Sequence, residues 1–355
     1  MKKFHLKNSM SILAGISAAA LLTAILSGCN EKKNNAALSE VTDFSGHIAS
    51  EVNVGYVDVT GSGKLTDTIG LARDKGFFKE EFDKIGVKIN LIPMTGAGPA
   101  INEALASGDL DIGTLGDVPA VLGKASGIDT KIISFSDFAG GASLIAGKGT
   151  TYTSIADLKG KQIATQRGAF MHRTLAYLLE EAGLTFKDIE FVHANAQTAA
   201  EMLVTGNVDA AVVGGVTLAR LYEQGFNIVA DYRTSSQYRN AGVQIARTQY
   251  IKENPDIIKA FEVALARARL YAKENKNALL EQWTSTGESA SSYEYLYPGH
   301  DNYPRLRSAP DLIANYNDVL KFLLDNDLIQ QSKKFSITDW IDGRFYEYAL
   351  AEVGE

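Results

Sequence analysis

The sequence predicts an α/β protein built from two similar lobes. From residue 51 onward, short β-branched runs alternate with segments of helical periodicity, and the same alternation restarts near residue 161. This alternation is typical of βαβ units with a largely parallel sheet. The length of 355 residues accommodates two domains at roughly 150 residues each. We therefore expect two α/β lobes, followed by the helical segment that ends the chain.

The elements of each lobe follow from the periodicity of the apolar residues. In the first unit we expect strands at 52–57, 87–92, 110–113 and 130–135, and helices at 71–85 (broken at Gly76), 99–106 and 118–125. In the second unit we expect strands at 161–164, 189–193, 210–213 and 226–230, and helices at 169–182 and 196–204.

An internal repeat supports the two-lobed reading. A shift of 98 positions aligns seven identical pairs: Glu103/Glu201, Leu105/Leu203, Gly108/Gly206, Asp111/Asp209, Gly116/Gly214, Val118/Val216 and Gly127/Gly225. An offset of this length is too long for a solenoid and indicates a duplicated lobe. Because Asp111 and Asp209 occupy equivalent positions, a role in a turn or helix cap is favoured over ligand binding for both.

Two short hydrophobic stretches, 142–146 and 242–246, bracket the second unit. They are expected to be two crossover strands that carry the chain into the second lobe and back, forming a hinge. This assigns 51–140 plus 246–355 to lobe one and 141–245 to lobe two. Beyond residue 247, helical periodicity at 255–274 and 309–326 predicts C-terminal helices that pack on the first lobe.

Charge and cysteine content exclude several classes of protein. With 35 basic and 42 acidic residues, the formal net charge is −7, which argues against nucleic-acid binding because such proteins concentrate Lys and Arg. One cysteine allows neither an internal disulfide nor a zinc site of the CxxC type. The five histidines show no metal-ligand spacing, so we predict no metal, and no cofactor.

The first thirty residues read as a targeting segment. Lys2, Lys3 and Lys7 precede an apolar run at 10–26, the order of a signal peptide, and 17 residues are short for a membrane span. Leu26-Ser27-Gly28-Cys29 resembles the bacterial lipoprotein box, which implies lipidation of Cys29; an incidental cysteine beside an ordinary signal peptide is the alternative. Removal of 1–28 leaves 327 residues with a net charge of −10, and 29–50 is expected to be a flexible tether.

Several ordered segments resemble the solute-binding proteins of bacterial ABC importers. The segments are Val54-Gly55-Tyr56, 108–113 with 116–119, 157–164, and 206–210. They are similar to the aliphatic sulfonate, taurine and nitrate binders, a group that includes thiamine-precursor binders. The resemblance implies a type II periplasmic-binding-protein-like fold whose lobes close on a solute.

The same resemblance implies what the protein does and where. We expect a monomeric, lipid-anchored protein on the extracytoplasmic face of the cell membrane, with an ABC permease and its ATPase as partners. The solute is expected to be a small anionic or nitrogen- or sulfur-containing organic molecule, such as an aliphatic sulfonate or taurine. A thiamine precursor, nitrate, or a sensor role without a permease are the alternatives.

An enzyme is disfavoured by the absence of catalytic motifs. The chain has no Gly-x-Ser-x-Gly elbow and no nucleotide fingerprint after a strand. The pyrimidine synthases that share this fold carry a cysteine-rich motif, which one cysteine cannot supply. The protein is therefore predicted not to be an enzyme.

Candidate ligand contacts lie where strands end, because helix N-termini there present free N–H groups to a crevice. In lobe one these are Tyr56, Asp58, Thr60, Thr95, Gly96, Gly116 and Asp117. For Thr95 and Gly96, a plain helix start has about equal weight.

In lobe two the candidates are Arg167, His172 and Thr217. The resemblance implies that the helix start at 166–172 holds an anionic head group, to which Arg167 and His172 would donate; a histidine satisfied by backbone or solvent has equal weight. Phe170 and Met171 at this helix start favour a larger or less polar ligand. Asn195 and Phe138 are weaker candidates.

Three alternating tyrosines, Tyr293, Tyr295 and Tyr297, could reach the mouth of the cleft. A surface strand or loop is the favoured reading of that alternation.

Overall fold

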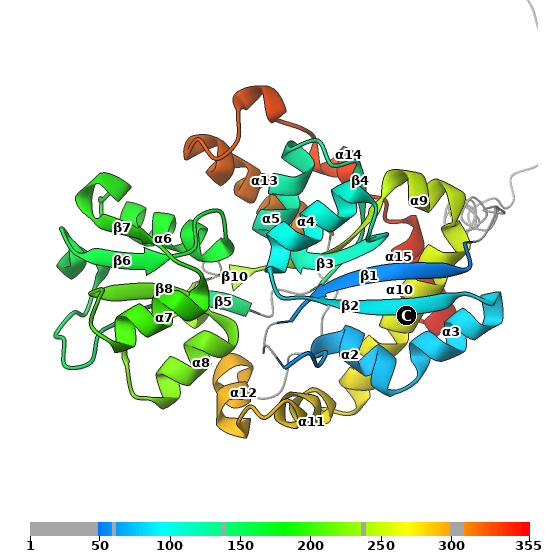
Figure 1. Ribbon diagram of the computed structural model, residues 1–355, viewed down its shortest axis with the longest axis horizontal. Coiled ribbons are helices and arrows are strands. Elements are labelled where there is room, and N and C mark those ends of the chain that lie inside the picture. The colour runs from blue at the N-terminus through cyan, green and yellow to red at the C-terminus, as the bar shows by residue number, and fades with distance from the viewer. Residues whose placement is uncertain (1–48, 59–61, 137–139, 236–238, 299–308) are drawn as a thin grey trace, which may run out of the picture. The chain divides into compact units, whose positions relative to one another are not determined.

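A computed structural model describes residues 49–58, 62–136, 140–235, 239–298 and 309–355 (Figure 1). The predicted signal peptide, Cys29 and nearly all of the predicted tether lie outside the described residues, as do Thr60 and Phe138. Within the part of the chain that is described, no helix is long and apolar enough to cross a membrane.

The first sheet has the strand order β2 (Lys88–Met94), β1 (Glu51–Val57), β3 (Ile112–Gly116), β11 (Gly242–Arg247) and β4 (Thr130–Phe135). Strand β1 runs parallel to both β2 and β3, whereas β11 runs antiparallel to β3 and β4. Its helices are α2 (Asp67–Asp74), α3 (Phe77–Ile85), α4 (Ala97–Ser107) and α5 (Asp117–Ala125). The predicted break at Gly76 separates α2 from α3, because Gly76 adopts φ 78° there.

The second sheet is built from β7 (Glu190–His193), β6 (Gln162–Thr165), β8 (Ala210–Gly214), β5 (Gly140–Ala146), β9 (Asn227–Ala230) and the short β10 (Arg239–Asn240). It carries α6 (Phe170–Glu181), α7 (Ala196–Val204) and α8 (Gly215–Glu223). Strand β6 runs parallel to β7 and β8, and β5 runs antiparallel to β8 and β9.

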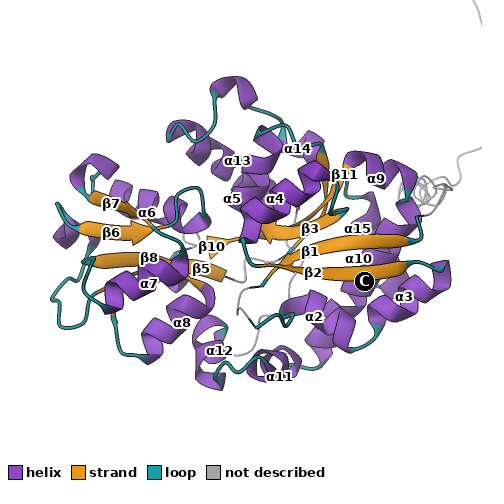
Figure 2. Cartoon of the chain, in the orientation of Figure 1, coloured by secondary structure: helices purple, strands orange, loops and turns teal. Residues whose placement is uncertain are grey.

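The two sheets therefore have the same strand order, β2-β1-β3-β11-β4 and β7-β6-β8-β5-β9. Their α5 and α8 begin 98 residues apart, which is the offset of the sequence repeat. The fourth strand is β11 in the first sheet and β5 in the second, and each follows a point where the chain passes from one lobe to the other. Strands β5 and β11 therefore lie in different sheets and do not pair with each other (Figures 1 and 2). The predicted α/β fold with two lobes is confirmed.

The chain ends in helices α9 (Thr248–Glu253), α10 (Pro255–Glu274), α11 (Ala278–Ser285), α12 (Ala290–Leu296), α13 (Ala309–Asp325), α14 (Ile337–Trp340) and α15 (Arg344–Val353). Helix α10 packs against α2, α3 and α15, and α13 packs against α5. These contacts lie on the first lobe, as predicted. Helix α12 differs, because it packs against α8 of the second lobe (Figure 1).

The alternating tyrosines do not form a strand or surface loop. Tyr293 and Tyr295 belong to α12 and are only 2% and 4% exposed. The ring of Tyr295 stacks on Tyr222 of α8 with the centroids 4.0 Å apart, while Tyr293 lies 6.0 Å from Trp283 of α11. The period-two alternation is misleading here because α12 has neighbours on two sides and buries residues two positions apart.

Candidate functional site

A hollow of about 410 Å³ lies where the two sheets face each other. Its first-lobe wall comes from the ends of β1 and β3, the starts of α2, α4 and β11, part of α5, and Ser136 after β4. Its second-lobe wall comes from the segment Gln166 to Met171 and from Asn240 of β10. Carboxyl ends of parallel strands meet at one edge of a sheet, which is where ligands bind in open α/β folds. We call this hollow the cleft.

The second-lobe wall is shaped by the turn between β6 and α6. Gly168 adopts φ 74°, and a Cβ at this position would lie 3.4 Å from Leu122 of the first lobe. Arg167 donates its backbone N–H to Nδ1 of His193 at 3.1 Å, and its guanidinium lies 4.6 Å from the centroid of Phe191. The turn thus holds Arg167 by its backbone and by ring stacking, and leaves its guanidinium nitrogens available to a ligand.

The charges of the cleft are few. Among the described residues that line it, Arg167 is the one cationic side chain and Asp67 the one carboxylate. Asp67 turns its carboxylate back on its own helix, accepting the N–H of Ile69 at 2.8 Å. Much of the remaining wall is apolar, including Phe170 and Met171. The cleft therefore offers one cation within largely apolar surroundings.

A set of polar residues in the cleft was missed by the sequence analysis: Thr114, Ser136, Asn240 and Gln244. Gln244 is 2% exposed and donates from Nε2 to Oγ of Ser136 at 3.0 Å. A signal existed for Gln244, since it is the one polar residue inside the apolar stretch 242–246. For Ser136, only its position after a strand pointed to the cleft.

Three of the predicted contacts line the cleft, namely Tyr56, Gly116 and Arg167. Others lie elsewhere. Asp58 accepts the N–H of Gly63 at 2.8 Å within its own loop, and Thr95 and Gly96 are exposed beside the start of α4 rather than on the cleft wall.

The second-lobe candidate Thr217 also lies away from the cleft. It lines a separate hollow between α7 and α8. The weaker candidate Asn195 caps α7 by accepting the N–H of Thr198 at 2.9 Å. Both side chains belong to the helices of lobe two and do not form the wall facing lobe one.

Asp117 must be reassigned from ligand binding to joining the lobes. It is fully buried, and Oδ2 accepts hydrogen bonds from Arg173 of α6 at 3.2 Å, from the N–H of Ala241 at 3.2 Å and from Asn315 of α13 at 3.0 Å. Its Oδ1 accepts the N–H of Val118 at 2.8 Å. With its acceptors engaged inside the protein, the carboxylate is not presented to a solute.

His172 is likewise corrected. It is 2% exposed, and its ring lies 5.0 to 5.4 Å from the rings of Phe186, Phe191 and Phe322. Nδ1 accepts the N–H of Gly168 at 3.3 Å. Burial, with Arg167 nearby, lowers the pKa of His172 to about 4. The imidazole is therefore neutral at pH 7, and its hydrogen bond with Gly168 stabilises the turn between β6 and α6.

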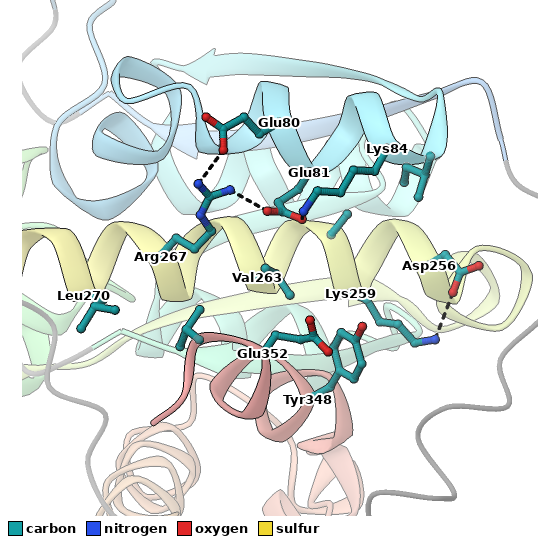
Figure 3. A pocket seen from close by; sticks show the side chains of 13 residues that line it. Glu80, Glu81, Lys84, Asp256, Lys259, Val263, Arg267, Leu270, Tyr348 and Glu352 are labelled. Atoms are coloured by element: carbon teal, nitrogen blue, oxygen red, sulfur yellow. Dashed lines mark hydrogen bonds and ion pairs between the residues drawn. The ribbon is translucent and has the colours of Figure 1, made fainter.

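A larger hollow of about 690 Å³ lies between α3, α10 and α15 (Figure 3). Arg267 donates to Glu80 at 2.5 Å and to Glu81 at 2.6 Å, and Lys259 lies 3.0 Å from Asp256. Both of these cations are thus paired with carboxylates of the protein. The hollow also lies at no strand end, so we do not assign it as the ligand site.

Comparisons with known proteins agree with the architecture. The model of the family described as NMT1/THI5 like matches residues 68–278. A putative aliphatic sulfonates-binding protein of Bacillus subtilis (strain 168) is 25% identical over 285 residues, which are 79% of this chain and 84% of that protein.

Two solved structures, a binding protein and an enzyme, have folds similar to that of this chain. A putative periplasmic sulfonate-binding protein from Methylobacillus flagellatus KT aligns with a TM-score of 0.73 and 25% identity, over 87% of this chain and 96% of that one. The desulfurization enzyme DSZB aligns with a TM-score of 0.69 at 17% identity, over 85% of this chain and 99% of that one; this likeness shows the fold alone. Since the family model covers more than half of the residues, the chain belongs to the NMT1/THI5-like family.

Proposed function

We propose that the protein is the solute-binding component of an ABC importer and that it captures a small organic anion, such as an aliphatic sulfonate, between its lobes. The observation that carries this proposal is Arg167, the single cationic side chain among the described residues that line the interlobe cleft. A guanidinium suits a sulfonate or carboxylate because it can donate two parallel hydrogen bonds. The sulfonate-binding names of its relatives support the same class of solute.

The walls of the cleft favour an organic anion over nitrate. A volume of about 410 Å³ lies in the range of small-molecule sites. Phe170, Met171 and Leu115 contribute apolar surface to it. An alkyl or aryl group of the solute would bury this surface, whereas nitrate would leave it exposed to water. A thiamine precursor remains the alternative that also has an organic body.

We also propose that the protein is anchored to the membrane by a lipid on Cys29 and works outside the cytoplasm. Its partners are then a permease and the ATPase of that permease. The motif Leu26-Ser27-Gly28-Cys29 supports the anchor, and the periplasmic relative supports the compartment. The alternative, a lipid-anchored sensor, would use the same cleft without a permease.

The test is calorimetric titration with ethanesulfonate, taurine, nitrate and a thiamine-precursor pyrimidine. We expect ethanesulfonate or taurine to bind more tightly than nitrate. Arg167→Ala should weaken the binding of the anion about tenfold or more, which corresponds to roughly 1.5–3 kcal/mol for a charged hydrogen bond. Arg167→Lys should recover part of this loss by restoring the charge without the planar fork.

The matched control is Arg344→Ala, which removes an exposed arginine that pairs with Asp342 at 2.8 Å and does not line the cleft. Its affinities should equal those of the unchanged protein. If Arg167→Ala binds ethanesulfonate as tightly as the unchanged protein, Arg167 does not hold the solute. If only the pyrimidine binds, the alternative replaces the sulfonate.

A further inference from the structure

A chain of buried hydrogen bonds runs from helix α10 to the floor of the cleft. Glu262 of α10 lies 2.7 Å from Oγ of Ser134, which lies 2.9 Å from Oε1 of Gln244. Nε2 of Gln244 then donates to Oγ of Ser136 at 3.0 Å. Glu262 is fully buried and Ser134 and Gln244 are each 2% exposed, whereas Ser136 and Gln244 line the cleft. The cleft is thus connected to a carboxyl group that no solute can touch.

The geometry of the sheet places these side chains in line. Ser134 and Gln244 stand opposite each other in the antiparallel pair of β4 and β11, so their side chains share one face. Ser136 follows two residues after Ser134 and therefore points to the same side. A shift in register between Gln244 and Ile245 bends β11 at this point, next to the cleft.

The number of protons fixes the direction of the chain. A serine hydroxyl donates one hydrogen bond, and an ionised carboxylate donates none. With Oε1 of Gln244 facing Ser134, the Ser134 proton goes to Gln244 and cannot also serve Glu262. The contact between Glu262 and Ser134 is then made only if Glu262 is protonated and donates.

The surroundings of Glu262 favour its neutral form. Burial raises the pKa of Glu262 to about 7, although Arg269 on the same helix and Ser134 act in the opposite direction. Its Oε2 has no hydrogen-bond partner among the described residues, which is costly for a buried carboxylate. Tyr346 of α15 faces the same region, and its pKa is raised chiefly by burial.

The other charges around α10 face elsewhere. From α2, Asp67 faces Arg269; desolvation of its carboxyl group raises its pKa to about 6 even though the residue keeps exposed surface. From α3, Glu80 and Glu81 pair with Arg267 in the hollow of Figure 3. Glu262 is thus the titrating group that reaches Ser136 through hydrogen bonds.

We propose that Ser136 determines specificity by donating its hydroxyl proton to an anionic oxygen of the solute, and that Glu262 is its positioning residue, acting through Ser134 and Gln244. This inference rests on the proposed function. With Glu262 protonated, each group donates to the next, and the Ser136 hydroxyl proton is left for the cleft. The chain ends as a hydrogen-bond donor, which suits sulfonate or carboxylate oxygens.

Ionisation of Glu262 reverses the chain. Ser134 must then donate to the carboxylate, and the Gln244 amide turns over to donate to Ser134. Ser136 next donates back to Oε1 of Gln244 and presents lone pairs to the cleft, where they repel an anion. The affinity for an anion should therefore fall as the pH rises through the pKa of Glu262.

The test is calorimetric titration of ethanesulfonate between about pH 5.5 and 8.5, a range in which this anion does not titrate and Glu262 does. We expect the unchanged protein to lose about tenfold in affinity across this range. Glu262→Gln, whose amide always has a proton to donate to Ser134, should keep the tight binding at every pH. Ser136→Ala should bind weakly at every pH.

Two further variants exclude simpler explanations. Glu81→Gln removes a carboxyl group that faces Arg267 on the opposite side of α10 and should leave both the affinity and its pH dependence unchanged. Asp67→Asn removes the one carboxyl group among the described residues that line the cleft. The loss of affinity through about pH 7 should persist in this variant.

Two outcomes would overturn the inference alone: ethanesulfonate binding that is independent of pH in the unchanged protein, or a Glu262→Gln variant as weak as Ser136→Ala. Absence of ethanesulfonate binding at every pH would instead reject the proposed function, and the inference with it. Infrared difference spectra of the free protein against Glu262→Gln give a readout without solute. A protonated-carboxyl band should be present at about pH 5.5 and absent at about pH 8.5, and its absence at both would contradict the inference.

Discussion

The two lobes repeat one device for joining their strands. In the first lobe, Asp111 accepts the N–H of Asn53 at 2.9 Å; in the second, Asp209 accepts the N–H of Gln162 at 2.9 Å. In each lobe, the backbone N–H of the same aspartate returns a hydrogen bond to the same partner residue. The duplicated aspartates therefore link β1 to β3 and β6 to β8, a structural role that differs from the predicted turn or helix cap.

The lobes differ where the next helix begins. Asp117 starts α5 of the first lobe and binds Arg173 of the second, whereas the equivalent start of α8 is Gly215, with φ 57°. The position that holds strands together is thus the same in both lobes, and the position that faces the other lobe is not. The repeat therefore preserves the residue that links the strands, whereas Asp117, which binds Arg173 of the other lobe, has no counterpart at the start of α8.

Asp117→Ala should have the largest effect on the comparison of the lobes. Asp117 and Arg173 are 0% and 1% exposed, and removing one partner of a buried ion pair leaves the other charge uncompensated. We expect the free energy of unfolding to fall by about 3–5 kcal/mol, measured by urea denaturation.

Asp318→Asn is the control for this change. Its carboxylate lies 3.7 Å from Arg173, but its side chain is 48% exposed, so its loss should cost about 1 kcal/mol or less. A cost for Asp117→Ala no greater than that of Asp318→Asn would show that the contact between the lobes does not depend on the buried pair.

The repeat made much of the fold predictable from the sequence. The identities that include Asp111 and Asp209 identified the duplicated unit, and the period of the apolar residues gave β4 and α10 with the bounds that the structure has. The tyrosines of α12 were misread because their burial depends on α8 and α11, which are remote in sequence. Local periodicity contains no information about such neighbours.

The cleft was less predictable than the fold. Position after a strand selected Tyr56 and Arg167, which line the cleft. The same rule selected Asp117 and His172, whose partners come from the other lobe or from α13. Gln244 was missed because one polar residue inside the apolar stretch 242–246 indicates a cleft residue only once its partners Ser134 and Ser136 are known. Side chains whose roles depend on tertiary neighbours could not be assigned from the order of residues alone.

Buried titratable groups extend the comparison to pH. His172 of the second lobe has its pKa lowered to about 4, and Glu262 beside the first sheet has its pKa raised to about 7, both mainly by burial. Both groups favour the neutral form in the folded protein. Between about pH 4.5 and 6.5, a rise in pH therefore increases the stability that His172 contributes and decreases the stability that Glu262 contributes.

The direction of each effect follows from proton uptake. Below pH 6.5 the unfolded chain protonates His172 while the folded protein does not, so this stability is present above pH 6.5 and is lost as the pH falls toward 4. Above pH 4.5 the unfolded chain ionises Glu262 while the folded protein does not, so that stability is lost as the pH rises toward 7. Each effect amounts to about 3 kcal/mol at most.

Two matched glutamine variants separate these contributions. Between about pH 4.5 and 6.5, the stability of His172→Gln should fall with rising pH relative to the unchanged protein, and that of Glu262→Gln should rise. Urea denaturation at several pH values measures both differences. Parallel curves for the two variants would contradict the assignment of opposite signs.

The smallest expected effect distinguishes the two duplicated aspartates. Asp111 has a side chain 10% exposed and is paired with Arg247 at 2.5 Å, whereas that of Asp209 is 33% exposed and its nearest cation, Lys161, is 4.0 Å away. Asp111→Ala should therefore cost about 2–3 kcal/mol, because the partly buried Arg247 loses a charged acceptor. Asp209→Ala should cost about 1 kcal/mol, because its hydrogen bonds to Gln162 and, at 3.4 Å, to Tyr152 are more exposed. Equal costs, measured by urea denaturation of the two variants side by side, would show that the shared bond between the strands, and not the cation beside it, sets the stability of both lobes.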